Sequence, residues 1–389
     1  MRHVLCALTI WLAGASFAFA QPFAFHGGSV GSEGHPRGIV AADFDGDGHL
    51  DFATANFGSS PHDVSVWHGD GNGGFDRPEF YAVGKGPFSI AAGDVNHDGH
   101  PDLAVAVADA FKVTILLWTP SGFVVSANIV FPAPSSSEVP AAASPREIGL
   151  VDINRDGNLD VVYTLDVDEG GFEITLGAGD GVHWTRHSGL IIGRGTQGLA
   201  IGDLNNDGLP DIIATNAIDG VAVVALNTGN GTGGNETYKV GRGPRNVVIA
   251  DFNHDRYPDF ATINTDDGTV TIYVQNPAAP ADGPHFGNPV TITGVGVSPR
   301  DIEAVDADGD GVVDLAITDY GENRVLVLKN DGTGHFPAAG RVRLASVSNP
   351  RTLAIGDFDE DGRPDILVGN QGNGAVILFM NNTAFPGRP

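Results

Sequence analysis

The stretch Asp43-Phe44-Asp45-Gly46-Asp47-Gly48-His49-Leu50-Asp51 decides how this chain folds. Aspartates occupy its first, third, fifth and ninth positions, and glycine occupies the sixth. Oxygens at alternate residues of a tight loop suit a hard cation that takes roughly six to eight oxygen ligands, and calcium is the first candidate. Glycine at the sixth position permits the positive φ that brings those oxygens to one point.

The same pattern recurs six more times along the chain. The first aspartates of successive copies are separated by 51, 58, 51, 48, 55 and 51 residues. Seven copies at a nearly constant period predict a repeat architecture. The alternative interpretation is a series of polar hairpin turns that hold no metal, because Asp and Gly are common in turns.

Each loop is predicted to bind one calcium ion, up to seven in all, through side chains at positions one, three, five and nine and a backbone carbonyl at position seven. The predicted side-chain ligands are Asp43, Asp45, Asp47 and Asp51; Asp94, Asn96, Asp98 and Asp102; Asp152, Asn154, Asp156 and Asp160; Asp203, Asn205, Asp207 and Asp211; Asp251, Asn253, Asp255 and Asp259; Asp306, Asp308, Asp310 and Asp314; and Asp357, Asp359, Asp361 and Asp365. The predicted carbonyl ligands belong to His49, His100, Asn158, Leu209, Tyr257, Val312 and Arg363. The rings of His49, His97, His100 and His254 are interpreted as exposed loop side chains and not as ligands.

Loop five, which begins at Asp251, departs from the pattern because Arg256 replaces the sixth-position glycine. A Cβ is unfavourable at positive φ, and the guanidinium adds positive charge beside the site. We therefore expect this loop to bind calcium most weakly. An EF-hand is excluded because the closing acid falls at position nine, not twelve, and β-rich segments flank the loop.

The acidity of the chain reflects these loops. The formal net charge is −27, and the loop positions supply half of the 48 acidic residues. A field of this sign disfavours nucleic acid as a partner.

The first 20 residues are typical of a secretory signal. Arg2 and His3 precede an apolar run over residues 4–19, and Ala18-Phe19-Ala20 offers a cleavage site. No segment is apolar for long enough to predict a membrane span after cleavage. The only cysteine, Cys6, lies in this segment, so the mature chain is expected to lack disulfides. We expect an exported protein, periplasmic or extracellular, with one domain over residues 21–389.

The rest of each repeat predicts strands. Apolar runs of four to six residues, such as those at 221–226 and 247–250, are bounded by Gly, Asn, Asp and Pro. Four such runs per repeat and seven repeats predict an all-β, seven-bladed β-propeller of four-stranded antiparallel blades. A β-solenoid is the alternative. The last repeat stops after its third run, so residues 23–30 are expected to supply the missing strand and hide an open edge.

The loops Phe44-Asp45-Gly46-Asp47-Gly48 and Phe358-Asp359-Glu360-Asp361-Gly362 resemble those of the FG-GAP/VCBS repeat family, over residues 23–382. That family includes the calcium-binding propeller of integrin α chains, related lectins and some polysaccharide lyases. The resemblance implies a propeller with calcium in its loops, and leaves the biochemical role open.

A second repeated motif falls on the face opposite the loops. Arg37, Arg146, Arg245, Arg300 and Arg351 each follow a proline just before the first strand, while Phe88 and Gln197 replace arginine in repeats two and four. One interpretation is that each arginine ties neighbouring blades to the amides that end the second strands. The other is a ring of guanidinium groups that captures an acidic ligand, with Phe88 stacking on a sugar. The Pro/Ser-rich insertion over residues 132–140 is predicted to lie on the same face.

Three functions are compatible with these motifs. We favour a secreted, calcium-stabilised binding or adhesion module for carbohydrate or protein, with no catalysis. A polysaccharide lyase or other carbohydrate-active enzyme is the second, although His183-Trp184-Thr185-Arg186-His187 is interpreted as an outer strand and no catalytic fingerprint appears. An architectural module of an exported assembly is the third. Oligomeric state is not indicated.

Overall fold

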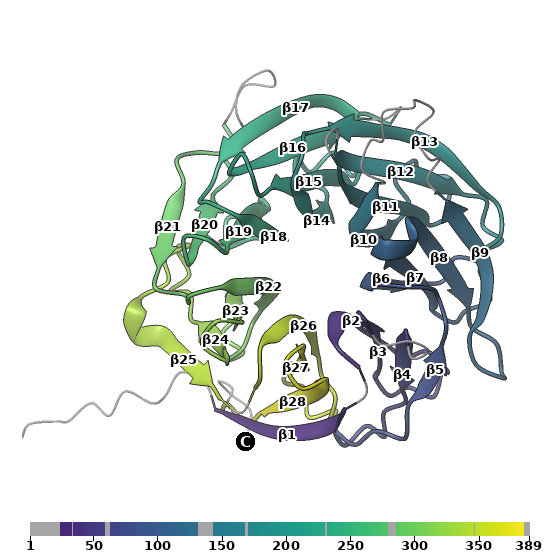
Figure 1. Cartoon of the computed structure of the whole chain (residues 1–389). Helices are drawn as coiled ribbons and strands as arrows, with labels where there is room; N and C mark the ends of the chain where they lie inside the picture. Colours follow the sequence, from purple (N-terminus) through teal and green to yellow (C-terminus); the bar gives the residue numbers. More distant parts are fainter. Residues whose placement is uncertain are drawn as a thin grey trace, which may run out of the picture.

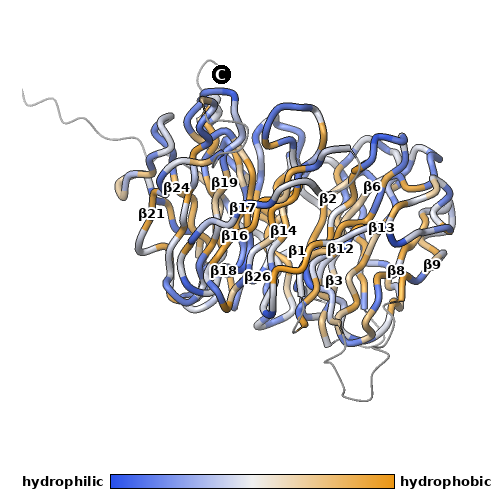
Figure 2. Tube along the Cα trace, turned by 90° about the horizontal axis from the view of Figure 1, so that it is seen from above, coloured by the Kyte–Doolittle hydropathy of each residue, from blue (hydrophilic) through white to orange (hydrophobic). Residues whose placement is uncertain are grey.

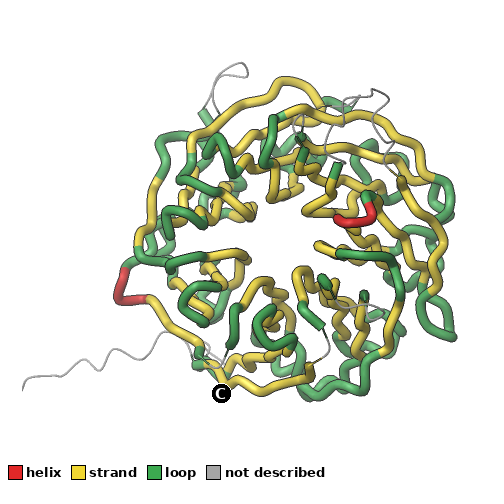
Figure 3. The backbone as a smooth tube through the Cα atoms, in the orientation of Figure 1, coloured by secondary structure: helices red, strands yellow, loops and turns green. Residues whose placement is uncertain are grey.

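The computed structural model describes residues 24–32, 34–58, 63–130, 143–167, 170–229, 232–278, 285–345 and 347–384. The predicted signal at 1–20 and the insertion at 132–140 lie outside these residues. In the described part, seven four-stranded antiparallel sheets surround a central axis (Figure 1). The helix found there is limited to two 3₁₀ turns, Ala108–Ala110 and Ala338–Gly340 (Figure 3). The predicted seven-bladed all-β propeller is therefore confirmed. No helix among the described residues is long and apolar enough to cross a membrane.

Blades one to three follow in chain order. Blade one contains β2 (Pro36–Ala42), β3 (Asp51–Asn56), β4 (Val64–Trp67) and β5 (Glu79–Tyr81). Blade two contains β6 (Pro87–Gly93), β7 (Asp102–Val107), β8 (Lys112–Leu117) and β9 (Val124–Val130). Blade three contains β10 (Ser144–Val151), β11 (Asp160–Asp166), β12 (Gly171–Gly177) and β13 (Trp184–Ile191).

Blades four to seven repeat the same order. Blade four contains β14 (Thr196–Gly202), β15 (Asp211–Asn216), β16 (Val221–Asn227) and β17 (Thr232–Lys239). Blade five contains β18 (Pro244–Ala250), β19 (Asp259–Asn264), β20 (Thr269–Tyr273) and β21 (Val290–Thr293). Blade six contains β22 (Pro299–Val305), β23 (Asp314–Asp319), β24 (Arg324–Leu328) and β25 (Arg341–Leu344). Blade seven contains β26 (Pro350–Gly356), β27 (Asp365–Asn370), β28 (Ala375–Asn381) and β1 (Phe25–Ser32).

The N-terminal strand closes the ring. Strand β1 pairs antiparallel with β28, from Phe25 opposite Asn381 to Ser32 opposite Ala375, and Figure 1 shows these two strands side by side. A sheet edge left open would expose unpaired N–H and C=O groups. The N-terminal strand, predicted at residues 23–30 and found at Phe25–Ser32, therefore completes the last blade as expected.

The core lies between the blades. Second strands such as β3 and β7 are buried at every residue, because each is covered by the neighbouring blade on both faces. Phe44 and Val64 of blade one pack with Leu103 of blade two in one such cluster. Figure 2 shows hydrophobic colouring along many strands and hydrophilic colouring at many connecting turns. The turns at the two faces are therefore free to carry polar sites.

The first strand of every blade lines the central channel and begins with a register shift. Such bulges re-aim side chains locally. Consecutive residues at these shifts, for example Arg300 with Asp301 and Arg351 with Thr352, line the same cavity. Each first strand runs from the arginine face to an acidic loop, so the two sites lie at opposite ends of strands about 20 Å long.

The packing of β1 in the last blade predicts how alanine substitutions at its glycines affect stability. A Cβ at Gly31 would lie 2.2 Å from Cη2 of the buried Trp67, whereas a Cβ at Gly28 meets nothing within 4 Å. Gly31→Ala is expected to lower the free energy of unfolding by about 1–3 kcal/mol through overpacking. Gly28→Ala, the matched control in the same strand, should change it by less than about 0.5 kcal/mol. Urea unfolding of both variants measures the difference, and equal stabilities would contradict this packing.

Candidate functional site

The first aspartate of each acidic loop folds the loop around its own carboxylate. Asp43 accepts hydrogen bonds from the N–H groups of Asp47, at 3.2 Å, and Gly48, at 2.9 Å. The sixth-position N–H donates to the first aspartate in the other six loops as well. The loop backbone is therefore organised by the same carboxylates that were predicted to bind a cation.

Two positions of every loop adopt positive φ. The sixth does so as predicted, including Arg256, whose φ is 74°. The fourth does so as well, and five of its residues are not glycine: His97, Arg155, Asn206, His254 and Glu360. Left-handed backbone costs such residues roughly 1–2 kcal/mol each. Sequence reasoning missed the fourth position because its residue type varies from loop to loop.

The ninth-position aspartate joins each loop to the end of the third strand. Asp160 Oδ2 accepts the N–H of Ile153 at 3.0 Å, and its Oδ1 accepts that of Gly177 at 2.9 Å. The equivalent pair of bonds is present in the other six blades. Burial raises the pKa of Asp160 to about 6, although the two N–H groups oppose the shift. This residue is thus a structural tie, and its role as a cation ligand stays a prediction.

The predicted donor sets fit a hard cation. In loop one, carboxylate oxygens of Asp43, Asp45 and Asp47 lie within 4.8 Å of one another. Comparable groups are Asp306, Asp308 and Asp314 in loop six, and Asp357, Asp359 and Asp361 in loop seven. Clustered like charges of this kind favour a counter-cation. In loops two to five the third-position Asn donates its amide N–H to the fifth-position Asp, as Asn96 does to Asp98 at 2.9 Å, so that amide must turn to offer its oxygen.

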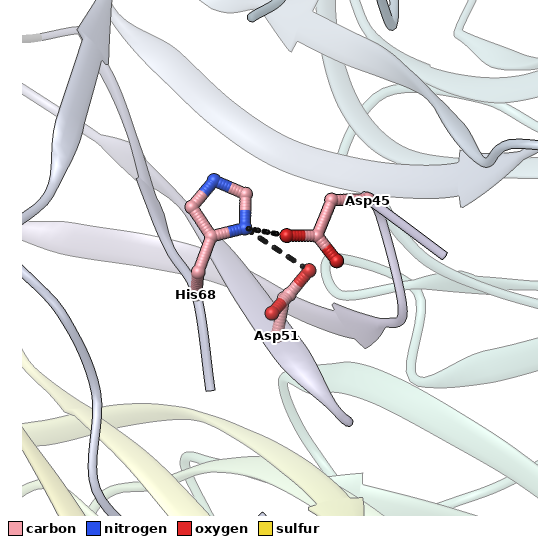
Figure 4. A group of neighbouring side chains, drawn as sticks. All are labelled: Asp45, Asp51 and His68. Carbon is pink, nitrogen blue, oxygen red and sulfur yellow. Dashed lines mark hydrogen bonds and ion pairs between the residues drawn. The ribbon is translucent and has the colours of Figure 1, made fainter. Parts of the chain in front are cut away.

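Besides the Arg363 guanidinium, which contacts Asp361 in loop seven, two loops have a nitrogen from the end of the third strand at their edge that sequence reasoning missed. His68 Nδ1 lies 3.3 Å from Asp51 Oδ2 and 3.6 Å from Asp45 Oδ2 (Figure 4). The hydrogen bond to Asp51 raises the pKa of His68 above its ordinary value. In blade six the Lys329 ammonium contacts Asp308 and lies 2.9 Å from Asp310. Aligning the ends of the third strands across the repeats would have found both residues.

The arginine motif converges at the opposite mouth of the channel. Six of the seven predicted ligand-face residues line one cavity there, namely Arg37, Phe88, Gln197, Arg245, Arg300 and Arg351. The seventh, Arg146, places its guanidinium carbon 4.8 Å from the centre of the Phe88 ring. Residues spread over the whole chain are therefore brought to one point.

This mouth brings several positive charges close together. Burial, followed by repulsion from neighbouring arginines, lowers the pKa of Arg351 to about 9. The same two causes lower the pKa of Arg37 and Arg245 to about 10. The Nε atoms of Arg37 and Arg300 are buried and find no hydrogen-bond partner among the described residues. Arg146 differs, because it donates to Asp166 at 2.8 Å.

Two of the strand-two amides make hydrogen bonds within their own blades, and Phe88 contacts the arginines. Asn56 Nδ2 donates to Ser65 Oγ at 2.7 Å, and Asn264 Nδ2 to Thr271 Oγ1 at 2.9 Å, within their own blades. Phe88 is only 8% exposed, and its ring faces the guanidinium groups of Arg37, Arg146 and Arg351. Its aromatic face supports the arginines through cation–π contacts, and stacking on a sugar stays a prediction.

A layer of acids lies behind the arginines, and the sequence motifs did not reveal it. Glu147, Asp301 and Glu303 line a channel cavity of about 360 Å³. Asp301 accepts hydrogen bonds from Asn246 Nδ2 at 2.5 Å and from the Leu353 N–H at 2.8 Å. Burial, reinforced by the neighbouring acids, raises the pKa of Glu147 and of Glu303 to about 8. At neutral pH these two acids are therefore largely protonated and neutralise little of the arginine charge.

The fold and the seven acidic loops define a repeat propeller. A profile of the FG-GAP-like repeat family matches residues 43–105, 152–214, 203–262 and 306–368, more than half of the chain, and these matches contain all seven loops. The chain therefore belongs to the FG-GAP-like repeat family. A search among curated proteins found no match.

Solved structures share the fold at low sequence identity. BBS1N in complex with ARL6DN, soaked with lead, aligns with a TM-score of 0.62 and 14% identity over 94% of this chain and 98% of that one. An Agrocybe aegerita lectin that recognises non-reducing terminal N-acetylglucosamine aligns with a TM-score of 0.55 and 19% sequence identity, over 86% of this chain and 85% of that one. A Lactobacillus plantarum protein aligns with a TM-score of 0.60 and 9% sequence identity, over 82% of this chain and 86% of that one. At such low sequence identities, the structural similarity shows only that these proteins share the fold.

The buried acids predict a particular pH dependence of stability. Because the pKa of Glu147 rises from 4.5 to about 8 on folding, the folded state holds its proton more tightly, and stability falls as pH rises through this window. The Glu147→Gln variant should have the same free energy of unfolding as the wild type at pH 4.5, and a higher one at pH 8. Urea unfolding at both pH values checks this. Glu322→Gln, at an exposed glutamate, is the control, and a Glu147→Gln stability that runs parallel to wild type would contradict the assignment.

Proposed function

We propose that this protein is an exported, calcium-stabilised binding module whose channel mouth captures the carboxylate or sulfate groups of an acidic carbohydrate. The observation that carries the proposal is the convergence of Arg37, Arg245, Arg300 and Arg351 in one cavity. The buried Nε atoms of Arg37 and Arg300 have no hydrogen-bond partner in the part of the chain that the structure describes. A guanidinium group offers planar, bidentate donors that match carboxylate and sulfate. An anionic ligand would supply the missing hydrogen bonds and relieve the mutual repulsion of the arginines.

A binding role is supported over catalysis by the residues at the mouth. A lyase needs a positioned general base besides a cation. Among the described residues, the mouth cavity is lined by arginine, amide, acidic, threonine and phenylalanine side chains, and Tyr320 beside it packs its ring 5.1 Å from the guanidinium carbon of Arg300. The related folds include a lectin that recognises a sugar and BBS1N bound to ARL6DN, and both are binding proteins by their descriptions. A protein ligand with acidic groups is therefore the alternative occupant.

Calcium in the acidic loops is the second part of the proposal. Because the predicted loop ligands are oxygen atoms and the chain has no cysteine after residue 20, bound ions would hold the loop at one end of a blade. Extracellular sites of this kind fill at roughly 10⁻⁴–10⁻³ M calcium.

Ligand capture is tested by binding to polygalacturonate and to heparin, with dextran as the neutral polymer. Arg245→Ala and Arg351→Ala should each weaken binding about 10- to 100-fold, because a hydrogen bond to a charged group contributes about 1.5–3 kcal/mol. Arg343→Ala, which removes the same charge from the exposed rim strand β25, is the matched control. Equal losses in all three variants, or equal binding of dextran, would refute the proposal, and release of unsaturated products would establish a lyase.

Calcium stabilisation is tested by thermal unfolding of the purified chain in EDTA and in a calcium series. The melting temperature should rise with calcium, because free calcium at about 100 times a site's dissociation constant stabilises the folded state by about 2.7 kcal/mol per site. Magnesium at the same ionic strength is the control for screening. A melting temperature that is the same in EDTA and in 10 mM calcium (a concentration about ten times the upper dissociation constant) would exclude this role.

A further inference from the structure

We propose that loop one is a site for a borderline transition metal of the zinc class, in which His68 supplies a nitrogen ligand beside Asp45 and Asp51. The residue at the end of the third strand would then decide which cation each loop accepts. This inference rests on the proposed function only in that the loops hold divalent cations.

The three side chains already have the spacing of a metal site (Figure 4). One ligand atom from each of Asp45, Asp51 and His68 lies within 4.8 Å of the others. The distances from His68 Nδ1 to the two carboxylates are 3.3 Å and 3.6 Å. Ligands that are each about 2.0–2.2 Å from a tetrahedral zinc are about 3.4 Å apart. The cluster therefore needs little rearrangement to accept the ion.

Backbone contacts on both sides hold His68 in this place. The N–H of the next residue, Gly69, donates to Asp51 Oδ1 at 2.8 Å. The His68 carbonyl accepts the N–H of Asp76 at 2.9 Å. Asp51 is wholly buried, and the His68 side chain is 25% exposed. The imidazole thus sits at the rim of the loop, on an anchored strand end, with its Nδ1 turned inward.

The imidazole nitrogen of His68 changes which metal ion the site prefers. Calcium takes oxygen ligands almost exclusively, whereas imidazole suits zinc, copper, nickel and iron. Asp45 also belongs to the group formed with Asp43 and Asp47, so the site can combine loop carboxylates with one imidazole. A mixed nitrogen and oxygen set of this kind favours zinc over calcium.

The other blades provide an internal comparison. The equivalent positions are identified by the N–H of the following residue, which donates to the ninth-position aspartate in each blade. They are Leu117, Leu176, Leu226, Val274, Lys329 and Met380. Five of these are apolar chains without a nitrogen or oxygen donor, which leaves an all-oxygen loop. Lys329 instead places an ammonium between Asp308 and Asp310, where it competes with any divalent ion.

The experiment measures zinc retention by the full mature chain in excess calcium. Metal-free protein is loaded with one equivalent of Zn²⁺ in 5 mM CaCl₂ (well above the expected calcium dissociation constants) and dialysed, and the bound zinc is determined by mass spectrometry. Wild type should retain about one zinc per chain, and His68→Ala should bind it at least about tenfold more weakly. Co²⁺ in place of Zn²⁺ should give a visible absorption band that His68→Ala abolishes.

Three further variants serve as controls for the zinc-retention experiment. His335→Ala removes an exposed histidine that lies 3.1 Å from Asp331 outside the acidic loops, and should leave zinc retention unchanged. Leu226→His, which places an imidazole at the equivalent position of blade four, should add a second zinc. His68→Gln, judged folded by its calcium-loaded melting temperature, separates ligand loss from misfolding.

Two results would overturn the inference and distinguish it from the proposed function. If calcium raises the melting temperature but displaces zinc as readily from wild type as from His68→Gln, loop one is an ordinary calcium loop and only this inference fails. If neither ion binds, the proposed calcium role fails with it.

Discussion

The buried carboxylate at the ninth position of each loop is the interaction on which the blade geometry depends. It receives one N–H from the loop and another from the end of the third strand, as Asp160 does from Ile153 and Gly177. A single side chain therefore fixes three consecutive segments of the blade. Because it has no exposure to water, losing either bond would leave a buried polar group unsatisfied, which is costly. Seven repetitions of this tie place the seven loops on one face.

The same strands that end in these loops begin at the arginine mouth, so the molecule separates its charges along the channel. Guanidinium groups gather at one end, clustered carboxylates at the other, and protonated acids such as Glu147 and Glu303 lie between. Burial moves the pKa of both kinds of group toward the neutral form, down for Arg351 and up for Glu147. Each end therefore holds a cluster of like charges that would gain from a bound counter-ion, an anion at the arginine mouth and a cation at the acidic loops.

Departures from the repeat are where the blades acquire individual chemistry. Phe88 replaces an arginine and becomes the surface on which three neighbouring guanidinium groups rest. His68 and Lys329 replace apolar residues at one position and reach into loops one and six. The inter-blade core does not constrain these sites, because they lie at the ends of strands. Packing between the blades determines the propeller ring, whereas residues at the strand ends can differ from blade to blade and so change what each site binds.

Local pattern in the sequence determined the fold class, the blade number, the closing N-terminal strand and the positions of the loops. These features follow from short-range rules, namely β-rich runs, a fixed period, and acids and glycine at set positions. The chain order alone also placed the five arginines on the face opposite the loops. Nothing local identified the acid layer of Glu147, Asp301 and Glu303 or the role of Phe88. Those depend on which residues of different blades meet at the axis, on bulges that turn consecutive side chains into the channel, and on what burial does to a charge. Such distances between residues far apart in the chain exist only once the ring has closed.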